Sequence, residues 1–256
     1  MTKNLEVKKR HVKMSNGELI KRICFIAAFS SISCLLYSVD LFKFKLPIFP
    51  SFLEFNFSMM PIIICAFMLG PIDAACVVII RCLVKWIVPG TGTQYVGELA
   101  DVLIGLAAAI PAGIVYNYTK LKHKSIIALS LVIIGWVLMG ILSNIFINIP
   151  WYNNLYFKSN YYKHGVHPYL VAPVDTAVYK ITFNHIHVNK DNFMFYYIVF
   201  AVIPFNLILS IVVTVVTGLV HKRLKFLYDI IGKKNNKEKI DFNENEELEN
   251  NNTDNE

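Results

Sequence analysis

The chain has 256 residues, of which 55% are hydrophobic and 17% are charged, and its formal net charge is +7. This composition is typical of a membrane protein and argues against an ordinary soluble domain. Apolar runs of about 18 residues or more recur along the chain, which is long enough for helices to cross about 30 Å of hydrocarbon. Strands with alternating polarity are not evident, so an outer-membrane barrel is not expected.

Taken in chain order, the apolar runs predict an all-α membrane protein with six transmembrane helices, at residues 19–42, 57–70, 72–88, 97–118, 125–149 and 193–221. The first run is too long for a signal-peptide core, so we expect it to be retained. Gly70–Pro71 is expected to break the second helix from the third. Residues 1–18 form a basic N-terminus, and residues 226–256 form a charged tail that we expect to be disordered.

The positive charges indicate the topology. Lysines and arginines precede the first helix, follow the last one, and occupy the short loop with Lys120, Lys122 and Lys124. The positive-inside rule then places both termini in the cytoplasm of a multi-pass cell-membrane protein, and six spans satisfy this arrangement. The basic ends therefore need no nucleic-acid partner. Residues 150–192 form a long outer loop, which we expect to be functional or to fold as a small cap.

Two pairs of ionisable residues fall inside the third and fourth predicted helices, where each residue costs roughly 2.5–3.5 kcal/mol on insertion scales. Arg81 and Lys85 are four residues apart and share a helix face. Glu98 and Asp101 lie one turn apart at the start of the next segment, at matching depth. Two interpretations stay open: an ion-pair network that holds two helices together, or the polar wall of a pocket that opens to the outside.

Two asparagines, Asn144 and Asn206, lie in the outer halves of the last two helices. An amide left unpaired in lipid is costly, so each should have a partner. One interpretation is that the amides join two helices by hydrogen bonds. The other is that both face a pocket and bind a ligand with amide-like donors and acceptors. Pro150 and Pro204 mark irregular backbone at the same depth, which is tolerated where it lines a cavity.

Small residues on the first helix suggest a contact with another helix. Ala27 and Ser31 are four residues apart, a spacing that allows close approach of a partner subunit or of a helix within the same chain. The outer loop holds four histidines, but no acidic or cysteine ligand joins them with convincing spacing, so we expect no metal site.

Motifs for ATP hydrolysis or for a hydrolase are not found in the sequence, and we do not expect an enzyme. A membrane enzyme acting on a lipid or isoprenoid, with Asp101, Glu98 and the histidines as catalytic groups, is one alternative. A structural or assembly protein, in which the buried charges only pack helices, is another.

Several stretches together resemble the S component of an energy-coupling-factor (ECF) transporter, of the riboflavin-specific type. They are FPSFLEFNFSMMP, AFMLGP, YVGELADVLIG, PAGIVY and PFNLI, and the resemblance covers roughly residues 19–225. It implies a membrane-embedded substrate-binding subunit of an ATP-driven vitamin importer. The implied partners are a transmembrane coupling subunit, two cytoplasmic ATPase subunits and riboflavin as the transported ligand, without a cofactor. An S component for another vitamin or a nucleobase-like compound is the alternative.

The resemblance also assigns residues. It matches Asn144 and Asn206 to the pocket asparagines of the family, and it assigns Ala27 and Ser31 to the contact with the coupling subunit. The family's motif usually continues with a lysine at the position of Leu209.

The chemistry of riboflavin suggests further candidates for the substrate site. An aromatic side chain, such as that of Phe52, Phe55 or Tyr95, could cover the flat ring. The sugar-alcohol tail needs polar partners, for which Glu98, Asp101 and Asn206 are candidates. Lys85 or Arg81 could supply the donor that the lysine would otherwise give.

Overall fold

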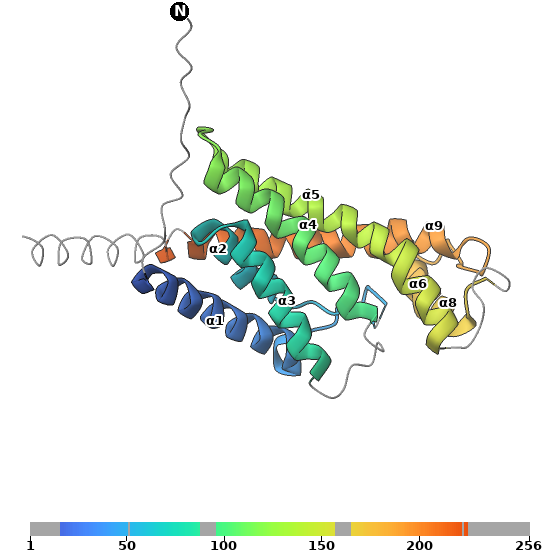
Figure 1. Cartoon of the computed structure of the whole chain (residues 1–256). Coiled ribbons are helices and arrows are strands. Elements are labelled where there is room, and N and C mark those ends of the chain that lie inside the picture. Colours follow the sequence, from blue (N-terminus) through green and yellow to red (C-terminus); the bar gives the residue numbers. More distant parts are fainter. Residues whose placement is uncertain (1–15, 51, 88–95, 157–164, 222, 225–256) are drawn as a thin grey trace, which may run out of the picture.

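The computed structural model describes residues 16–50, 52–87, 96–156, 165–221 and 223–224. These residues are mainly helical (Figure 1). The helices are α1 (Asn16–Ser38), α2 (Met59–Met68), α3 (Pro71–Ile87), α4 (Val96–Tyr118), α5 (Lys124–Ser143), α6 (Ile149–Trp151), α8 (Pro168–Ile181) and α9 (Phe193–Tyr197). Within the described part of the chain, the only β-structure is an isolated bridge between Phe44 and Phe55.

Helices occupy all six predicted positions. Four are long and apolar enough to cross a membrane: α1, α4, the segment Lys124–Asn154 and the segment Phe193–His221, which we call the C-terminal helix. The other two, α2 and α3, have 10 and 17 residues. Residues on every side of α2 are buried, so this helix lies inside the bundle, where it needs no contact with lipid. The number of spans stays a prediction.

Two helices contain π-helical turns and run further than a regular pattern suggests. The fifth predicted helix ends at residue 149, but the structure continues it through π turns at Asn144–Asn148 and Tyr152–Tyr156. The C-terminal helix has a π turn at Ile198–Val202. Such turns are rare and occur frequently at functional sites. Here they lie at the same end of the bundle as the two asparagines.

The break between α2 and α3 has a clear local cause. Gly70 adopts a positive φ of 118°, which strongly favours glycine, and Pro71 begins α3 with its fixed φ. The sharp turn brings Asp73 next to α1, where Arg22 Nε donates to its carboxylate at 2.6 Å. This end of α3 is therefore tied to α1.

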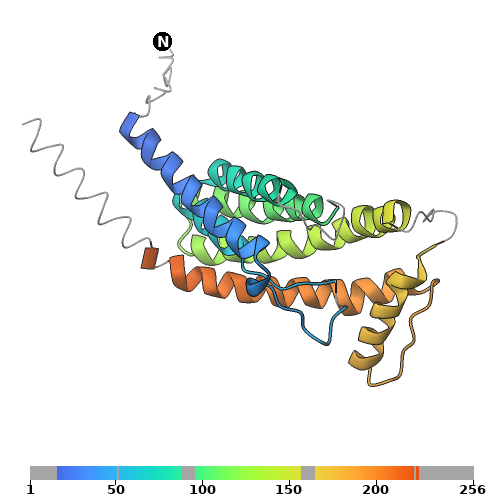
Figure 2. The same cartoon turned by 90° about the horizontal axis from the view of Figure 1, so that it is seen from below.

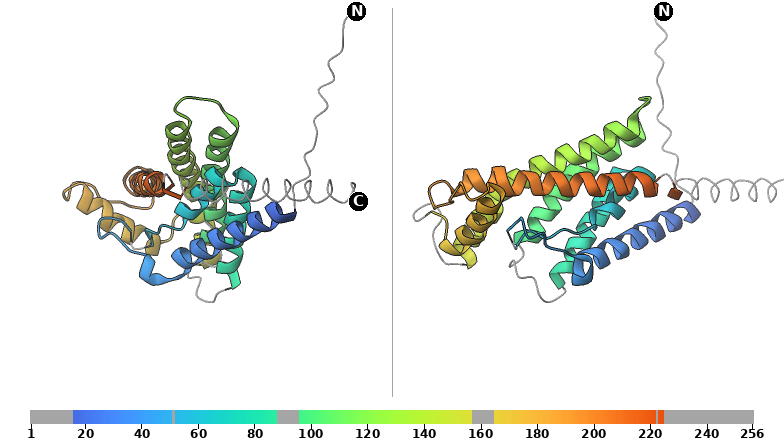
Figure 3. Two further views of the ribbon diagram at one scale, coloured as in Figure 1. Left: turned by 90° about the vertical axis from the view of Figure 1, so that its left-hand side faces the viewer. Right: turned by 180° about the vertical axis from the view of Figure 1, so that it is seen from behind.

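The bundle has two distinct ends. The start of α1, the α4–α5 connection and the end of the C-terminal helix lie at one end, and α8 lies at the other (Figures 1 and 3). The main core joins α2, α3, α4, α5 and the C-terminal helix, and a smaller core joins α8 to the outer end of the C-terminal helix. Close packing depends on glycine: a Cβ at Gly135 would lie 2.4 Å from the main-chain oxygen of Ala107.

Candidate ligand-binding cavity

A cavity of about 620 Å³ lies toward the end of the bundle that carries α8. Its walls come from the end of α1, the segment that follows it, α3, α4, the α5 segment and the C-terminal helix. This volume falls within the range of about 300–1,000 Å³ that is typical of small-molecule sites.

Most of the predicted substrate-site residues line this cavity. The structure brings together six of them: Phe52, Lys85, Glu98, Asp101, Asn144 and Asn206. Tyr95 lies outside the described residues. Phe55 is buried and is absent from the cavity lining, because its ring packs edge-on against Phe205 with the centroids 4.7 Å apart.

Asn206 lies in the cavity wall, and its hydrogen bond within the helix uses only part of the hydrogen-bonding capacity of its amide. Its Nδ2 donates to the main-chain oxygen of Val202 at 2.8 Å, within the π turn. This bond uses one amide hydrogen, and an amide offers a second hydrogen and an acceptor oxygen. The side chain lies against Gly140, where a Cβ would approach the amide atoms to 3.0 Å. The glycine therefore makes the space in which this amide sits.

Asn144 has a more structural role. Its Nδ2 donates to the main-chain oxygen of Gly140 at 2.8 Å. Its Oδ1 accepts from the Tyr197 hydroxyl at 2.7 Å and from Asn148 Nδ2 at 3.2 Å. The bond from Tyr197 joins the α5 segment to the C-terminal helix. Asn144 thus combines the two interpretations of the sequence, since it lines the cavity and holds two helices together.

The charges do not pair as their depth suggests. Ion pairs between described side chains include neither Arg81 nor Lys85. The Nη2 group of Arg81 instead donates to the main-chain oxygen of Asp101 at 3.4 Å, and its guanidinium carbon lies 4.7 Å from the centre of the Tyr37 ring. An ion-pair network between α3 and α4 is therefore not observed, and these residues form a polar part of the cavity wall.

Three aromatic residues of the cavity wall were not predicted from the sequence. Tyr37, Trp136 and Tyr197 all line the cavity, and they are 8%, 5% and 1% exposed. Each lies in an apolar run of the sequence, where an aromatic residue is typical of an ordinary hydrophobic core. Leu209 also lines the cavity and is 4% exposed.

The segment after α1 covers part of the cavity. Two main-chain hydrogen bonds, of 3.1 and 2.9 Å, join Phe44 to Phe55 and fold the segment back on itself. Lys43 bonds Asp40 at 2.9 Å, and Phe52 lies over Tyr197 with ring centroids 6.0 Å apart. Figure 2 shows this segment running from the end of α1 toward the C-terminal helix. The cavity is thus closed on one side by a folded loop.

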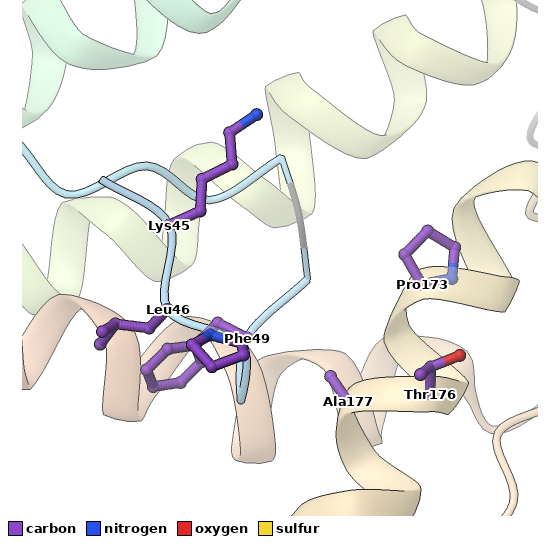
Figure 4. Close-up of a pocket in the computed structure, with 7 residues that line it drawn as sticks. Lys45, Leu46, Phe49, Pro173, Thr176 and Ala177 are labelled. Carbon is purple, nitrogen blue, oxygen red and sulfur yellow. The ribbon is translucent and has the colours of Figure 1, made fainter. Parts of the chain in front are cut away.

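A second pocket, of about 430 Å³, lies between this segment and α8. Leu46 and Phe49 form one side, and Pro173, Thr176 and Ala177 form the other (Figure 4). Lys45 points away from the apolar side chains and bonds Glu54 at 3.2 Å. The pocket offers few polar groups to a ligand, and the larger cavity is the better candidate for the functional site.

The predicted partner face of α1 is exposed. Ala27 and Ser31 both lie on the outside of the bundle, and the Ser31 hydroxyl donates to the main-chain oxygen of Ala27 at 2.8 Å. The hydroxyl is therefore satisfied within the helix, and the face presents small side chains. In the described part of the chain, this face is not used for packing within the monomer.

The described residues contain no group of three or more His, Cys, Asp or Glu side chains that could hold a metal ion. His187 lies 3.4 Å from Asp175, and both belong to the part of the chain around α8. His164 lies outside the described residues.

Comparison with known proteins agrees with this architecture. The family model described as "ECF transporter, substrate-specific component" matches residues 21–220. The riboflavin transporter FmnP of Bacillus subtilis (strain 168) is 28% identical over 207 residues, which are 80% of this chain and 93% of the relative. The riboflavin transporter RibU of Staphylococcus aureus (strain TCH60) is 27% identical over 211 residues, which are 82% of this chain and 93% of the relative.

A solved structure shares the fold. It is described as the S component of a bacterial ECF transporter and is 22% identical, with a TM-score of 0.54, covering 82% of this chain and 98% of that chain. The family model spans most of the chain, including every described cavity-lining helix. The chain is a membrane protein that belongs to the family of substrate-specific components of ECF transporters.

Proposed function

We propose that this chain is the riboflavin-binding subunit of an ATP-driven vitamin importer, and that riboflavin binds in the 620 Å³ cavity. The observation that carries the proposal is the Asn206 amide, which lies in the cavity wall with a donor and an acceptor beyond its one helix bond. The names of the two relatives support riboflavin as the ligand.

The cavity wall suits the parts of this ligand. The ring system of riboflavin is flat and carries carbonyl and N–H groups along one edge, which an amide can bind as both donor and acceptor. Phe52, Trp136 and Tyr197 supply aromatic surface for the ring. The hydroxyl groups of the tail need polar partners, and Glu98, Asp101 and Asn206 are the candidates.

We infer the partners and the orientation from the family and from the charges. The exposed face of α1 with Ala27 and Ser31 would contact the transmembrane coupling subunit, and two ATPase subunits would supply the energy. The basic α4–α5 connection would face the cytoplasm together with both termini, which places the cavity toward the outside. In this scheme the chain binds its ligand and catalyses no reaction.

One observation favours a second candidate ligand. Leu209 lines the cavity with an apolar side chain where the family's motif has a lysine. A different vitamin or a nucleobase-like compound would suit this change if the lysine normally contacts a group that is special to riboflavin. A competition assay of such compounds against bound riboflavin separates the two candidates.

Titration of the purified chain with riboflavin tests the proposal, since the fluorescence of the flavin reports binding. We expect saturable binding, and we expect Asn206→Ala to weaken it at least about tenfold, as the loss of a buried ligand hydrogen bond implies. Asn117→Ala is the control for a lost amide outside the cavity: Asn117 donates to the oxygen four residues earlier at 2.8 Å and also to the main-chain oxygen of Ala66 at 2.7 Å, so unchanged affinity in this variant would show that losing structural amide bonds does not by itself weaken binding. Folded protein that binds no riboflavin would refute the proposal.

A further inference from the structure

Arg81 is a buried cation whose contacts join α3 to three other segments. It is 1% exposed. Its Nη1 donates to the Ser58 hydroxyl at 2.9 Å, its Nη2 reaches the main-chain oxygen of Asp101 at 3.4 Å, and its guanidinium carbon lies 4.7 Å from the centre of the Tyr37 ring. Carboxylates of the described residues lie beyond ion-pair distance from it. Neutral groups therefore fix this charge in place.

Ser58 extends these contacts to the cavity wall and to α1. Its hydroxyl donates to Asn56 Oδ1 at 2.6 Å, and its main-chain N–H donates to the same oxygen at 3.1 Å. Its carbonyl oxygen accepts from the Ser33 hydroxyl of α1 at 2.7 Å. Asn56 and Ser58 both line the cavity. One buried network thus links Arg81 to the segment that covers the cavity and to the inner face of α1.

The guanidinium group itself is poorly placed to meet a ligand. Its Nε is shielded from solvent and lacks a hydrogen-bond acceptor among the described residues, and both Nη groups donate to protein atoms. Arg81 lines the cavity, but only 1% of its surface is exposed, so it contributes little of the surface that a ligand meets. Asn56, which the network holds through Ser58, is partly exposed, and Tyr37 is 8% exposed, so these two residues offer a ligand more surface than Arg81 does.

We propose that Arg81 is a positioning residue, which sets the ligand affinity of the cavity by fixing Ser58 and Tyr37 without touching the ligand. A buried charge keeps its donors directed at fixed acceptors, because leaving either side unpaired is costly. The wall is therefore held in its binding geometry before the ligand arrives. This inference rests on the proposed function, since riboflavin is the probe that measures affinity.

A double-mutant cycle in riboflavin affinity tests this role. Arg81→Met keeps the length of the side chain and removes its donors, and Ser58→Ala removes the hydroxyl that Arg81 holds. We expect each change to weaken binding about tenfold, the effect of losing one hydrogen bond to a charged group. We expect the double variant also to bind riboflavin about tenfold more weakly than the wild type, because the effects of two changes in one network are not additive. Losses that multiply to about a hundredfold would overturn the proposal.

Two further variants separate positioning from general stability. Arg81→Lys keeps a charged donor, and we expect it to lose less affinity than Arg81→Met. Arg22→Gln is the matched control: it breaks the 2.6 Å bond to Asp73 at the other end of α3 and should leave riboflavin affinity unchanged. If Arg81→Met does not fold, Arg81→Lys completes the cycle with Ser58→Ala. A wild-type chain that binds no riboflavin overturns the proposed function and this inference together, whereas binding with multiplied losses overturns this inference alone.

Discussion

The substitution Gly140→Ala tests whether the space beside Asn206 matters for binding. A Cβ at position 140 would lie 3.0 Å from Cγ and Oδ1 of Asn206 and 3.1 Å from its Nδ2. Ordinary van der Waals contact begins near 3.4 Å, so the amide has to move by a few tenths of an ångström. The amide is 6% exposed and is tied to Val202 at 2.8 Å, which leaves it little freedom to yield.

The expected size follows from the geometry. A misplacement of about 1 Å costs a binding or reacting group about a hundredfold in extreme cases, so a shift of a few tenths should cost roughly five- to tenfold in riboflavin affinity, or about 1–1.4 kcal/mol. The same change replaces a glycine inside a helix by alanine, and this replacement stabilises a helix by roughly 0.5–1 kcal/mol. We therefore expect the Gly140→Ala protein to remain folded and to bind riboflavin more weakly.

Fluorescence titration of purified protein measures the affinity, and thermal unfolding in the same detergent measures the stability. Gly218→Ala is the control, because a Cβ there would lie 3.4 Å from Leu129 Cδ1, which is an ordinary contact. Gly218 also lies outside the cavity lining. Gly140→Ala that binds riboflavin as tightly as the wild type would show that the Asn206 amide is not a ligand contact, or that the wall adapts freely. Either result contradicts the reasoning given for the site.

Three other substitutions have clear expected outcomes. Gly135→Ala places a methyl group 2.4 Å from a carbonyl oxygen of α4, and we expect it to force the two helices apart and destabilise the protein by about 1–3 kcal/mol, seen as a lower Tm. Arg22→Gln leaves the Asp73 carboxylate, whose side chain is 6% exposed, without its cation. Because the Arg22 side chain is 34% exposed, we expect the protein to lose only about 1–2 kcal/mol in stability and to keep its riboflavin affinity. Tyr197→Phe removes the donor to Asn144 at 2.7 Å, and we expect about 1 kcal/mol lower stability together with weaker riboflavin binding; an unchanged Tm would argue that water replaces the hydroxyl.

The network around Arg81 includes the helix that carries the proposed contact with the coupling subunit. Ser33 and Tyr37 lie on the inner face of α1 and contact the network, whereas Ala27 and Ser31 lie on the outer face of the same helix. The network that reaches the cavity wall and the proposed contact surface for the coupling subunit therefore lie on opposite faces of the same helix.

The helical class and the positions of the six apolar helices could be predicted from the sequence, whereas α8 and the extension of the fifth helix beyond residue 149 could not. Apolar runs longer than a bilayer crossing leave no alternative to helices, because the backbone must bond itself in lipid. Gly70–Pro71 marked the sharp break between α2 and α3, and costly polar groups such as Asn206 and Lys85 marked the cavity.

Which of those polar groups contact one another could be learned only from the tertiary structure. Matching depth suggested that Arg81 pairs with the Asp101 carboxylate, but the guanidinium donates to the Ser58 hydroxyl and to the main-chain oxygen of Asp101. Depth along a helix can be read from the sequence, whereas the rotation of each helix about its axis and the path of the covering loop depend on packing with neighbours far away in the chain. The apolar pattern of the sequence likewise did not predict the π turn that contains Asn144 or the one whose Val202 oxygen accepts from Asn206.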